Sequence, residues 1–322
     1  PAAAPAEGKG PDDDRGPDGG RSGSASSAPQ FVTPCSKVAK GEAQMAINSP
    51  EGVVGWNVNP EKVSLTAVAA LLYDRNTSAI VTLKDSGRAR PKDLDGARYA
   101  SYAARFEGRI VQKMIQNDGG EGDFQELTPP MLGIWNTLLG GGADATWAFL
   151  QWEGVEAAMK DVELNVFKLL DFGIPYAYAP CLCADPSWLD ANRDVARKFL
   201  AATAEGYKFA AADPVAAAAI LVELAKTDNG LDLDPELARG SAVFLADKIL
   251  GPDKRWGAMD AKIWSAYVDW LWESGLLTDG FQSRHPDEGR SFSLDDLRNG
   301  KAGKRIDRSS VPTVFTNKYL PE

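Results

Sequence analysis

The chain has 322 residues, of which 44% are hydrophobic and 25% are charged. It contains no apolar run close to the roughly 18 residues of a membrane-spanning helix, which indicates a soluble globular protein and excludes a membrane-embedded one. The net charge of -10 and a pI near 4.8 argue against a nucleic-acid surface, because phosphate binding uses clustered Lys and Arg. A chain of this length buries about 75% of its unfolded surface, which favours two lobes over one small core.

The sequence gives no sign of a catalytic or metal site. Three cysteines, Cys35, Cys181 and Cys183, are too few for a disulfide framework, and the Cys-x-Cys pair lacks the partners of a zinc site. His285 is the only histidine and lies in a polar stretch. The chain has no Gly-x-Ser-x-Gly, Walker loop, dinucleotide fingerprint or His-Glu-x-x-His motif. We therefore predict no catalytic residue, no metal site and no cofactor.

Residues 1–30 contain Pro, Gly, Asp and Ser without a large apolar side chain, so we expect a disordered head. Beyond it, short apolar runs with β-branched residues alternate with helical spacing. Alternation of this kind is typical of an α/β fold with an open sheet and favours parallel strands. The expected strands are residues 43–49, 78–83, 97–102, 144–150 and 164–170.

Two apolar helix faces are expected between these strands, one formed by Ile110, Met114 and Ile115 and the other by Val155, Ala158 and Met159. The glycine run in LGGGAD, residues 139–144, precedes a strand. Phosphate-binding loops instead follow a strand and open a helix, so we interpret this run as a turn.

From residue 189 onward the pattern is helical. Asp213-Pro214 and Asp234-Pro235 each supply an N-cap with proline at the first helical position. Residues 260–273 form a helix with one apolar face that ends at Gly275. The tryptophans of this region are interpreted as core, since an aromatic stripe at helical spacing is usually packing; they are Trp256, Trp264, Trp270 and Trp272.

Several segments occur in the order found in one known family. They are KGEAQMAINSPEGVV followed by GWNVNP, SAIVTLKDSGRARPKDLDG, GGGADATWAFLQWEGVEA, RKFLAATAEGYKFAAADPVAAAAIL and the closing FTNKYLP. Together they resemble the thiamine-pyrimidine branch of the type II periplasmic-binding-protein superfamily. That branch includes binding proteins for formylaminopyrimidine precursors, related alkanesulfonate and taurine binders, and the fungal thiamine pyrimidine synthase.

The resemblance implies a two-lobed type II fold with a helical C-terminal part. Family members begin with a strand, a helix and a strand that are here absent or replaced by the polar head, so the N-terminal portion of lobe one is expected to be missing. The implied divisions are a head at 1–30, the first part of lobe one at 31–94, lobe two at 95–175, the return to lobe one with the C-terminal helices at 176–281, a polar loop at 282–310 and a closing tail at 311–322.

The resemblance also implies a ligand between the lobes, at the carboxyl ends of the strands. On lobe two, Trp147, Phe149, Trp152 and Glu153 are candidate ligand contacts, because Trp147 and Phe149 share one strand face and Trp152 follows at the turn. The alternative places all three aromatic residues in the lobe core.

Further candidate contacts come from three other segments. In lobe one, Ser49 and Glu51 stand where a strand meets a helix, although Ser49 also fits an ordinary helix start. The segment SYAARFEGR matches a lobe-two loop that is glycine-rich and holds a phosphate in the synthase. Here Tyr102 and Arg105 are candidates, but most of the glycines are replaced, which puts phosphate binding in doubt. Near the return to lobe one, Tyr176 or Tyr178 would edge the site.

The function implied is binding of a small aminopyrimidine or related thiamine precursor, with a transporter permease as partner if the chain serves transport. One alternative is a synthase-like enzyme with pyridoxal phosphate and iron, but the sequence has no histidine at the family's position and only two neighbouring cysteines. Further alternatives are an alkanesulfonate or taurine binder and a degenerate interaction module. The sequence does not assign the compartment.

Overall fold

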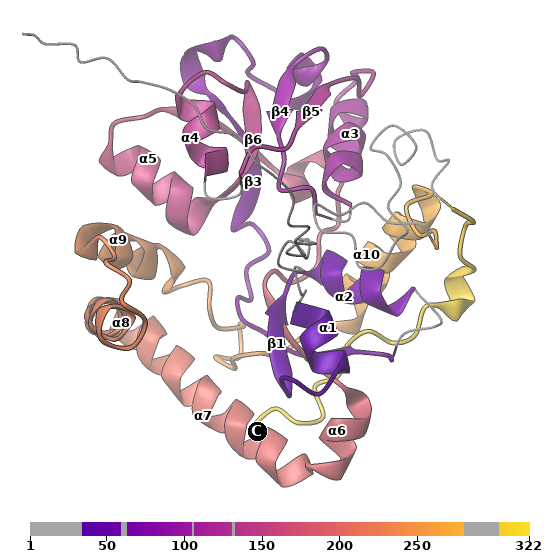
Figure 1. Ribbon diagram of the computed structural model, residues 1–322, viewed down its shortest axis with the longest axis vertical. Coiled ribbons are helices and arrows are strands. Elements are labelled where there is room, and N and C mark those ends of the chain that lie inside the picture. Colours follow the sequence, from indigo (N-terminus) through magenta and orange to yellow (C-terminus); the bar gives the residue numbers. More distant parts are fainter. Residues whose placement is uncertain (1–33, 59–62, 105, 131–132, 280–302) are drawn as a thin grey trace, which may run out of the picture. The chain divides into compact units, whose positions relative to one another are not determined.

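The computed structural model describes residues 34–58, 63–104, 106–130, 133–279 and 303–322 (Figure 1). The predicted head lies outside the described residues, as do His285 and most of the predicted polar loop. The helices are α1 (Pro34–Ala39), α2 (Pro50–Asn57), α3 (Glu107–Asn117), α4 (Ile134–Leu139), α5 (Val155–Met159), α6 (Pro186–Ala191), α7 (Arg193–Ala212), α8 (Pro214–Asn229), α9 (Pro235–Leu245) and α10 (Ala261–Glu273). The strands are β1 (Met45–Asn48), β2 (Thr66–Ala70), β3 (Ser78–Leu83), β4 (Arg98–Ala100), β5 (Gln125–Leu127), β6 (Ala145–Phe149), β7 (Leu164–Lys168) and β8 (Cys181–Ala184).

The strands form two sheets, which confirms the predicted two-lobed α/β fold. One sheet has the order β1-β8-β2 and the other the order β5-β4-β6-β3-β7. The chain passes from the first sheet to the second after β2 and returns after β7. The helix α4 packs on the larger sheet, against β3, β4 and β6 (Figure 1). All five predicted strand segments contain a strand.

The prediction of parallel strands is only partly right. The strand β4 runs parallel to β5 and β6, but β3 is antiparallel to β6 and β7, and β8 is antiparallel to both β1 and β2. The reversed strands, β3 and β8, are the ones that arrive from the other sheet. A strand that is not joined to its neighbour by a helical crossover need not run parallel to that neighbour. The periodicity of strands and helices in the sequence does not reveal which strands lack such a crossover. β3 belongs to the larger sheet, although it lies before the predicted boundary at residue 95.

The predicted helix starts in the C-terminal part are confirmed. The Asp213 side chain accepts from Ala216 N at 3.0 Å, and Asp234 accepts from Glu236 N at 2.9 Å. Proline follows each aspartate at the first helical position, where its missing N–H costs nothing. Aspartate and proline together thus fix where α8 and α9 begin.

The helix α10 and the closing tail belong to the lobe of the three-stranded sheet. Trp256 and Trp264 are buried as predicted, while Trp270 and Trp272 are half-buried. The helix is followed by Gly275 at φ 69°, a left-handed conformation that favours glycine. In the tail, Thr316 N donates to Ala67 O at 2.8 Å, and Ala67 N donates to Val314 O at the same distance. The tail therefore lies beside β2 and protects its edge.

One predicted helix face is wrong. Ile110, Met114 and Ile115 are fully buried on α3 as expected, but in α5 only Ala157 is buried. Ala158 and Met159 are exposed, with 47% of Met159 accessible. The segment Leu150–Gly154 before α5 is a π-helical turn, which shifts the rotation of the following helix relative to ordinary α-helical spacing.

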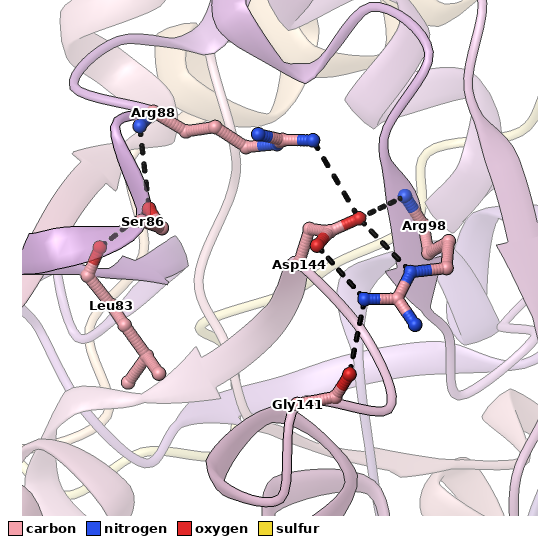
Figure 2. A network of polar contacts seen from close by, with 6 residues as sticks. All are labelled: Leu83, Ser86, Arg88, Arg98, Gly141 and Asp144. Atoms are coloured by element: carbon pink, nitrogen blue, oxygen red, sulfur yellow. Dashed lines mark hydrogen bonds and ion pairs between the residues drawn. The ribbon is translucent and has the colours of Figure 1, made fainter.

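A polar network joins the amino-terminal ends of β4 and β6 (Figure 2). Asp144, just before β6, accepts from Arg98 N at 2.8 Å and from Arg98 Nε at 3.2 Å, while Arg88 Nη2 lies 3.7 Å from the same carboxylate. Arg98 Nη2 also donates to Gly141 O at 3.0 Å, in the turn that the glycine run predicted. The Arg98 guanidinium lowers the pKa of the Asp144 carboxyl. The network holds the two parallel strands in register at their amino-terminal ends.

We expect Asp144→Ala to lower the melting temperature, because it leaves the backbone N–H and the guanidinium of Arg98 without their shared acceptor. Ligand affinity should not change, since the network lies at the amino ends of strands whose carboxyl ends face the cleft described below. Asp171→Ala, which removes an exposed carboxylate after β7, is the control. Thermal unfolding followed by circular dichroism gives the comparison, and equal melting temperatures for the two variants would contradict this role of Asp144.

Candidate functional site

A cleft of about 450 Å³ lies where the two lobes meet. A volume of this size suits a small organic ligand, for which pockets of about 300–1,000 Å³ are usual. The end of β1 and the first turn of α2 contribute from the smaller sheet, and the segments after β4 and β6 contribute from the larger one. The lining residues are Ile47, Asn48, Ser49, Glu51, Tyr102, Ala104, Glu107, Trp147, Phe149, Gln151, Tyr176, Ala179 and Pro180.

Six of the ten predicted site residues are among these lining residues: Ser49, Glu51, Tyr102, Trp147, Phe149 and Tyr176. They come together because the carboxyl ends of β1, β4 and β6 all lead into the cleft, as expected for open α/β sheets. A role in ligand binding stays a prediction for each of them.

The start of α2 places Ser49 and Glu51. The Ser49 hydroxyl accepts from Gly52 N at 3.1 Å, so this side chain is the N-cap of the helix as well as part of the lining. Pro50 occupies the first helical position. Both interpretations of Ser49 therefore apply to the same residue, and the cap directs Glu51 of the first turn to the cleft.

Glu51 is a buried carboxyl group with one partnered oxygen. It is 3% exposed, and its Oε1 accepts from the Tyr176 hydroxyl at 2.6 Å. Its Oε2 is buried without a hydrogen-bond partner among the described residues. Burial raises the pKa of Glu51, against the opposing effect of the Tyr176 hydrogen bond. This residue thus offers the cleft an oxygen that still requires a donor or a proton.

A second unpartnered acceptor belongs to Gln151, whose Oε1 is buried without a partner among the described residues. Gln151 follows β6 and lines the same cleft as Glu51. Buried polar atoms in native proteins nearly always have a partner, so each of these oxygens calls for a donor from a ligand or from water.

Aromatic rings form the apolar walls. Trp147 and Tyr176 pack with ring centroids 5.6 Å apart, and Tyr102 and Phe149 pack at 6.1 Å. Trp147 is only 5% exposed and belongs to the main core, whereas Phe149 is 39% exposed. Trp147 therefore combines the two alternatives considered from the sequence, because it packs in the core and also borders the cleft.

Glu107, at the start of α3, is bound to the turn after β4. Its Oε1 accepts from the Tyr99 hydroxyl at 2.8 Å and from Tyr102 N at 3.1 Å, and its Oε2 accepts from Ala104 N at 3.1 Å. The carboxyl group is 2% exposed, and burial raises its pKa to about 7. These three donors oppose that rise, because each stabilises the ionised form.

Four predicted site residues are not on the lining that the structure describes. Trp152 is half-buried in the π-helical turn, a segment that packs against α9. Glu153 accepts from Phe149 N at 2.9 Å and so closes this turn. Tyr178 is fully buried, and its hydroxyl accepts from Asp260 N at 3.0 Å. Arg105 lies outside the described residues.

Sequence reasoning missed the polar lining residues Asn48, Glu107 and Gln151, and the lining residues Ile47, Ala104, Ala179 and Pro180. Asn48 and Glu107 are each within two residues of a predicted contact, so their position at a strand end or helix start was the available signal. Gln151 also lies within two residues of predicted contacts, Phe149 and Trp152, but its orientation depends on the π-helical turn, which the sequence does not reveal.

The three cysteines are buried thiols, and two of them contact the lining residue Asn48. Asn48 Nδ2 donates to Cys35 Sγ at 2.7 Å, and Cys181 Sγ donates to Asn48 O at 3.4 Å. Burial raises the pKa of the Cys181 thiol, so it stays protonated. The described residues contain no group of three or more His, Cys, Asp or Glu side chains arranged to hold a metal ion.

Glu107 also predicts a pH dependence of stability. Its pKa is raised from 4.5 to about 7, so the folded state binds a proton more tightly than the unfolded state. Its contribution is therefore complete below pH 4.5 and is lost as the pH rises towards about 7, by at most about 1.4 kcal/mol per pH unit. Glu51 and Glu153, whose pKa values are also raised, act in the same direction.

We expect Glu107→Gln to remove this contribution while leaving those of Glu51 and Glu153. The free energy of unfolding, measured with denaturant across this range, should fall with pH more steeply in the wild type than in the variant. Parallel pH profiles would show that Glu107 has the same pKa in both states.

The comparison with protein families identifies the chain. Residues 28–217 match the family described as NMT1/THI5 like, more than half of the sequence. The chain belongs to this family. The formylaminopyrimidine-binding protein of Halalkalibacterium halodurans is 20% identical over 240 residues, which cover 74% of this chain and 71% of that protein.

Solved structures agree on the fold. The alkanesulfonate-binding protein SsuA from Xanthomonas axonopodis pv. citri, bound to MOPS, matches 75% of this chain and 78% of its own length, with a TM-score of 0.57 and 12% identity. The periplasmic aliphatic sulphonate binding protein SsuA from Escherichia coli matches 76% of this chain and 79% of its own, with a TM-score of 0.58 and 16% identity. Among the described residues, no helix is both long and apolar enough to cross a membrane.

Proposed function

We propose that this chain is a substrate-binding protein whose cleft holds a small aminopyrimidine or a related thiamine precursor. The observation that carries the proposal is the open oxygen of Glu51, a buried acceptor at the wall of a cleft lined by aromatic rings. A flat heteroaromatic ring with an amino group satisfies both features. The similarity to a formylaminopyrimidine-binding protein supports the same class of ligand.

The chemistry of Glu51 suits the edge of an aminopyrimidine. The Tyr176 hydroxyl occupies Oε1, so Oε2 is the atom that can accept from the amino group of the ligand. Gln151 offers another acceptor for an N–H of the ligand. The Tyr176 hydroxyl holds the carboxyl group in place.

The aromatic walls would supply the apolar part of the affinity. Stacking a base on an aromatic side chain contributes about 1–3 kcal/mol in nucleic-acid complexes. A micromolar dissociation constant needs about 8 kcal/mol, so the hydrogen bonds to Glu51 and Gln151 and the closure of the lobes must provide the rest.

A sulfonate ligand fits this lining less well. The described lining residues contain two carboxyl side chains and no Lys, Arg or His, whereas a sulfonate requires donors or cations around its oxygens. The likeness to sulfonate-binding proteins is at most 16% identical in the two structures compared and concerns the fold alone. The cleft thus favours an amino-substituted ring over a sulfonate.

The synthase alternative finds little support in the same residues. Pyridoxal phosphate needs a lysine for its aldehyde and donors for its phosphate. The described lining has no lysine, and the N–H groups of Tyr102 and Ala104 are already bonded to Glu107. These residues do not fit the cofactor, so we propose binding without catalysis, with a membrane permease as partner if the chain serves transport.

Calorimetric titration tests the proposal, using the hydroxymethyl aminopyrimidine of thiamine and ethanesulfonate as probes. The aminopyrimidine should bind and the sulfonate should not. Glu51→Gln should weaken aminopyrimidine binding by about 1–3 kcal/mol, because an amide that keeps its oxygen on the Tyr176 hydroxyl turns its NH2 group towards the amino group of the ligand, where two donors meet. Glu153→Gln is the matched control, since Glu153 lies off the lining and should leave the affinity unchanged. Tighter binding of the sulfonate, or equal losses in both variants, would refute the ligand class.

Trp147 should report the ligand. A ring bound beside Trp147 is expected to change the tryptophan fluorescence, and Trp147→Phe should abolish most of that change. In Trp152→Phe the response should persist, because Trp152 is not on the lining. A response that survives in Trp147→Phe and disappears in Trp152→Phe would place the ligand at the π-helical turn instead.

A further inference from the structure

The turn between β4 and α3 has the form of an anion-binding site. The N–H groups of Tyr102 and Ala104 and the hydroxyl of Tyr99 converge on one point at the start of α3. Ala103 between them has a φ of 53°, and its N–H is bonded to the Ser101 hydroxyl at 2.8 Å. Successive N–H groups of a turn with one left-handed residue, next to the start of a helix, attract negative charge.

The chain fills this site with its own carboxylate. Both oxygens of Glu107 are bonded to the converging donors, and the side chain is 2% exposed while lining the cleft. A ligand carrying phosphate or sulfonate would therefore meet a carboxylate where free N–H groups would otherwise stand. The unpartnered oxygen of Glu51 lies on the same lining and adds to this selection against anions.

We propose that Glu107 is a specificity-determining residue, which occupies the anion-binding turn before α3 and makes the cleft select uncharged aminopyrimidines over their phosphate esters. This inference rests on the proposed function for the identity of the ring, but the occupied turn is a separate feature. Neutral and anionic forms of one ring thus differ in affinity because of a single side chain that need not touch the ring.

We expect the removal of the Glu107 carboxylate to change anion binding in a way that a purely structural role does not predict. Removing the carboxylate frees two N–H groups and one hydroxyl that already converge, so an anion can take its place. A residue that only supported the fold would lower the affinity for neutral and anionic ligands alike. The ratio of the two affinities is therefore the informative quantity.

The experiment compares wild type, Glu107→Ala and Glu107→Gln with three probes: the hydroxymethyl aminopyrimidine, its phosphate monoester and inorganic phosphate. In the wild type the alcohol should bind at least about tenfold more tightly than the ester. In Glu107→Ala this preference should shrink by about tenfold or more, since hydrogen bonds to a charged group become available to the ester. Glu107→Gln keeps the side-chain volume and removes the charge, so it should give a smaller shift. It also supplies the comparison if Glu107→Ala does not fold.

Glu126→Gln is the matched control. It removes the neighbouring carboxylate whose charge raises the pKa of Glu107, but it leaves the turn filled. This variant should keep the preference for the alcohol. An unchanged ratio in both Glu107 variants, or a wild type that binds ester and alcohol equally, would overturn the inference.

Inorganic phosphate separates this inference from the proposed function. If no aminopyrimidine binds even to the wild type, the proposed ligand is wrong, and the role of Glu107 is then judged by phosphate alone. Phosphate should bind to Glu107→Ala and not to the wild type. Absence of phosphate binding in folded Glu107→Ala would refute the occupied anion site.

Discussion

The hydrogen bond between Glu51 and Tyr176 is the interaction on which the site depends. It joins the first turn of α2 to the segment that returns to the smaller sheet, over 2.6 Å and with both side chains almost fully buried. The Tyr176 ring also packs against Trp147 and Tyr267, and its carbonyl accepts from Arg75 Nη1 at 3.0 Å. The tyrosine is thus fixed on several sides, and it fixes one oxygen of the carboxyl group. The other oxygen is left to the cleft, where we propose that it accepts from the ligand.

In the larger sheet, the amino-terminal ends of the strands carry a stabilising polar network, and the carboxyl ends border the cleft. At the amino ends of β4 and β6, Arg98 and Asp144 exchange hydrogen bonds that hold the strands together. At the carboxyl ends the strands lead into segments that contribute Tyr102, Glu107 and Gln151 to the lining of the cleft. At this end the N–H groups of Tyr102 and Ala104 are bound by Glu107, and Gln151 Oε1 has no partner among the described residues. Under the proposed function, charge as well as shape would select the ligand.

The sequence predicts the fold well where local chemistry decides it. Asp213, Asp234 and Gly275 fix helix ends through caps and a left-handed turn, and the alternation of strands and helices gives the α/β class. Strand direction is not local: β3 and β8 run antiparallel because they cross between sheets, and their sequences carry no mark of that path. Likewise, Val155 and Met159 have helical spacing, but the π-helical turn before them changes the face that is buried.

In the site, too, some residues are predictable from local sequence and others depend on the fold. Ser49 and Glu51 were predictable because they stand at a helix start, and Trp147 because it lies on the same strand face as Phe149 at the strand end, where the resemblance to a known family also placed a ligand. Trp152 and Glu153 follow the same strand, yet the π-helical turn carries them off the lining. The sequence around Glu107 shows only that most of the glycines of the turn are replaced. The carboxylate that replaces an outside anion is visible only when its three donors are seen together.

On the proposed function, the open oxygen of Glu51 recognises an amino group on a flat ring. The most direct measurement is the affinity of the wild-type protein for the hydroxymethyl aminopyrimidine and for the analogue in which hydrogen replaces the amino group. The two ligands have the same ring and differ in the one donor that Glu51 requires. We predict that the analogue binds about tenfold more weakly or worse, as expected for the loss of a hydrogen bond to a buried carboxyl group. Equal affinities would contradict the claim.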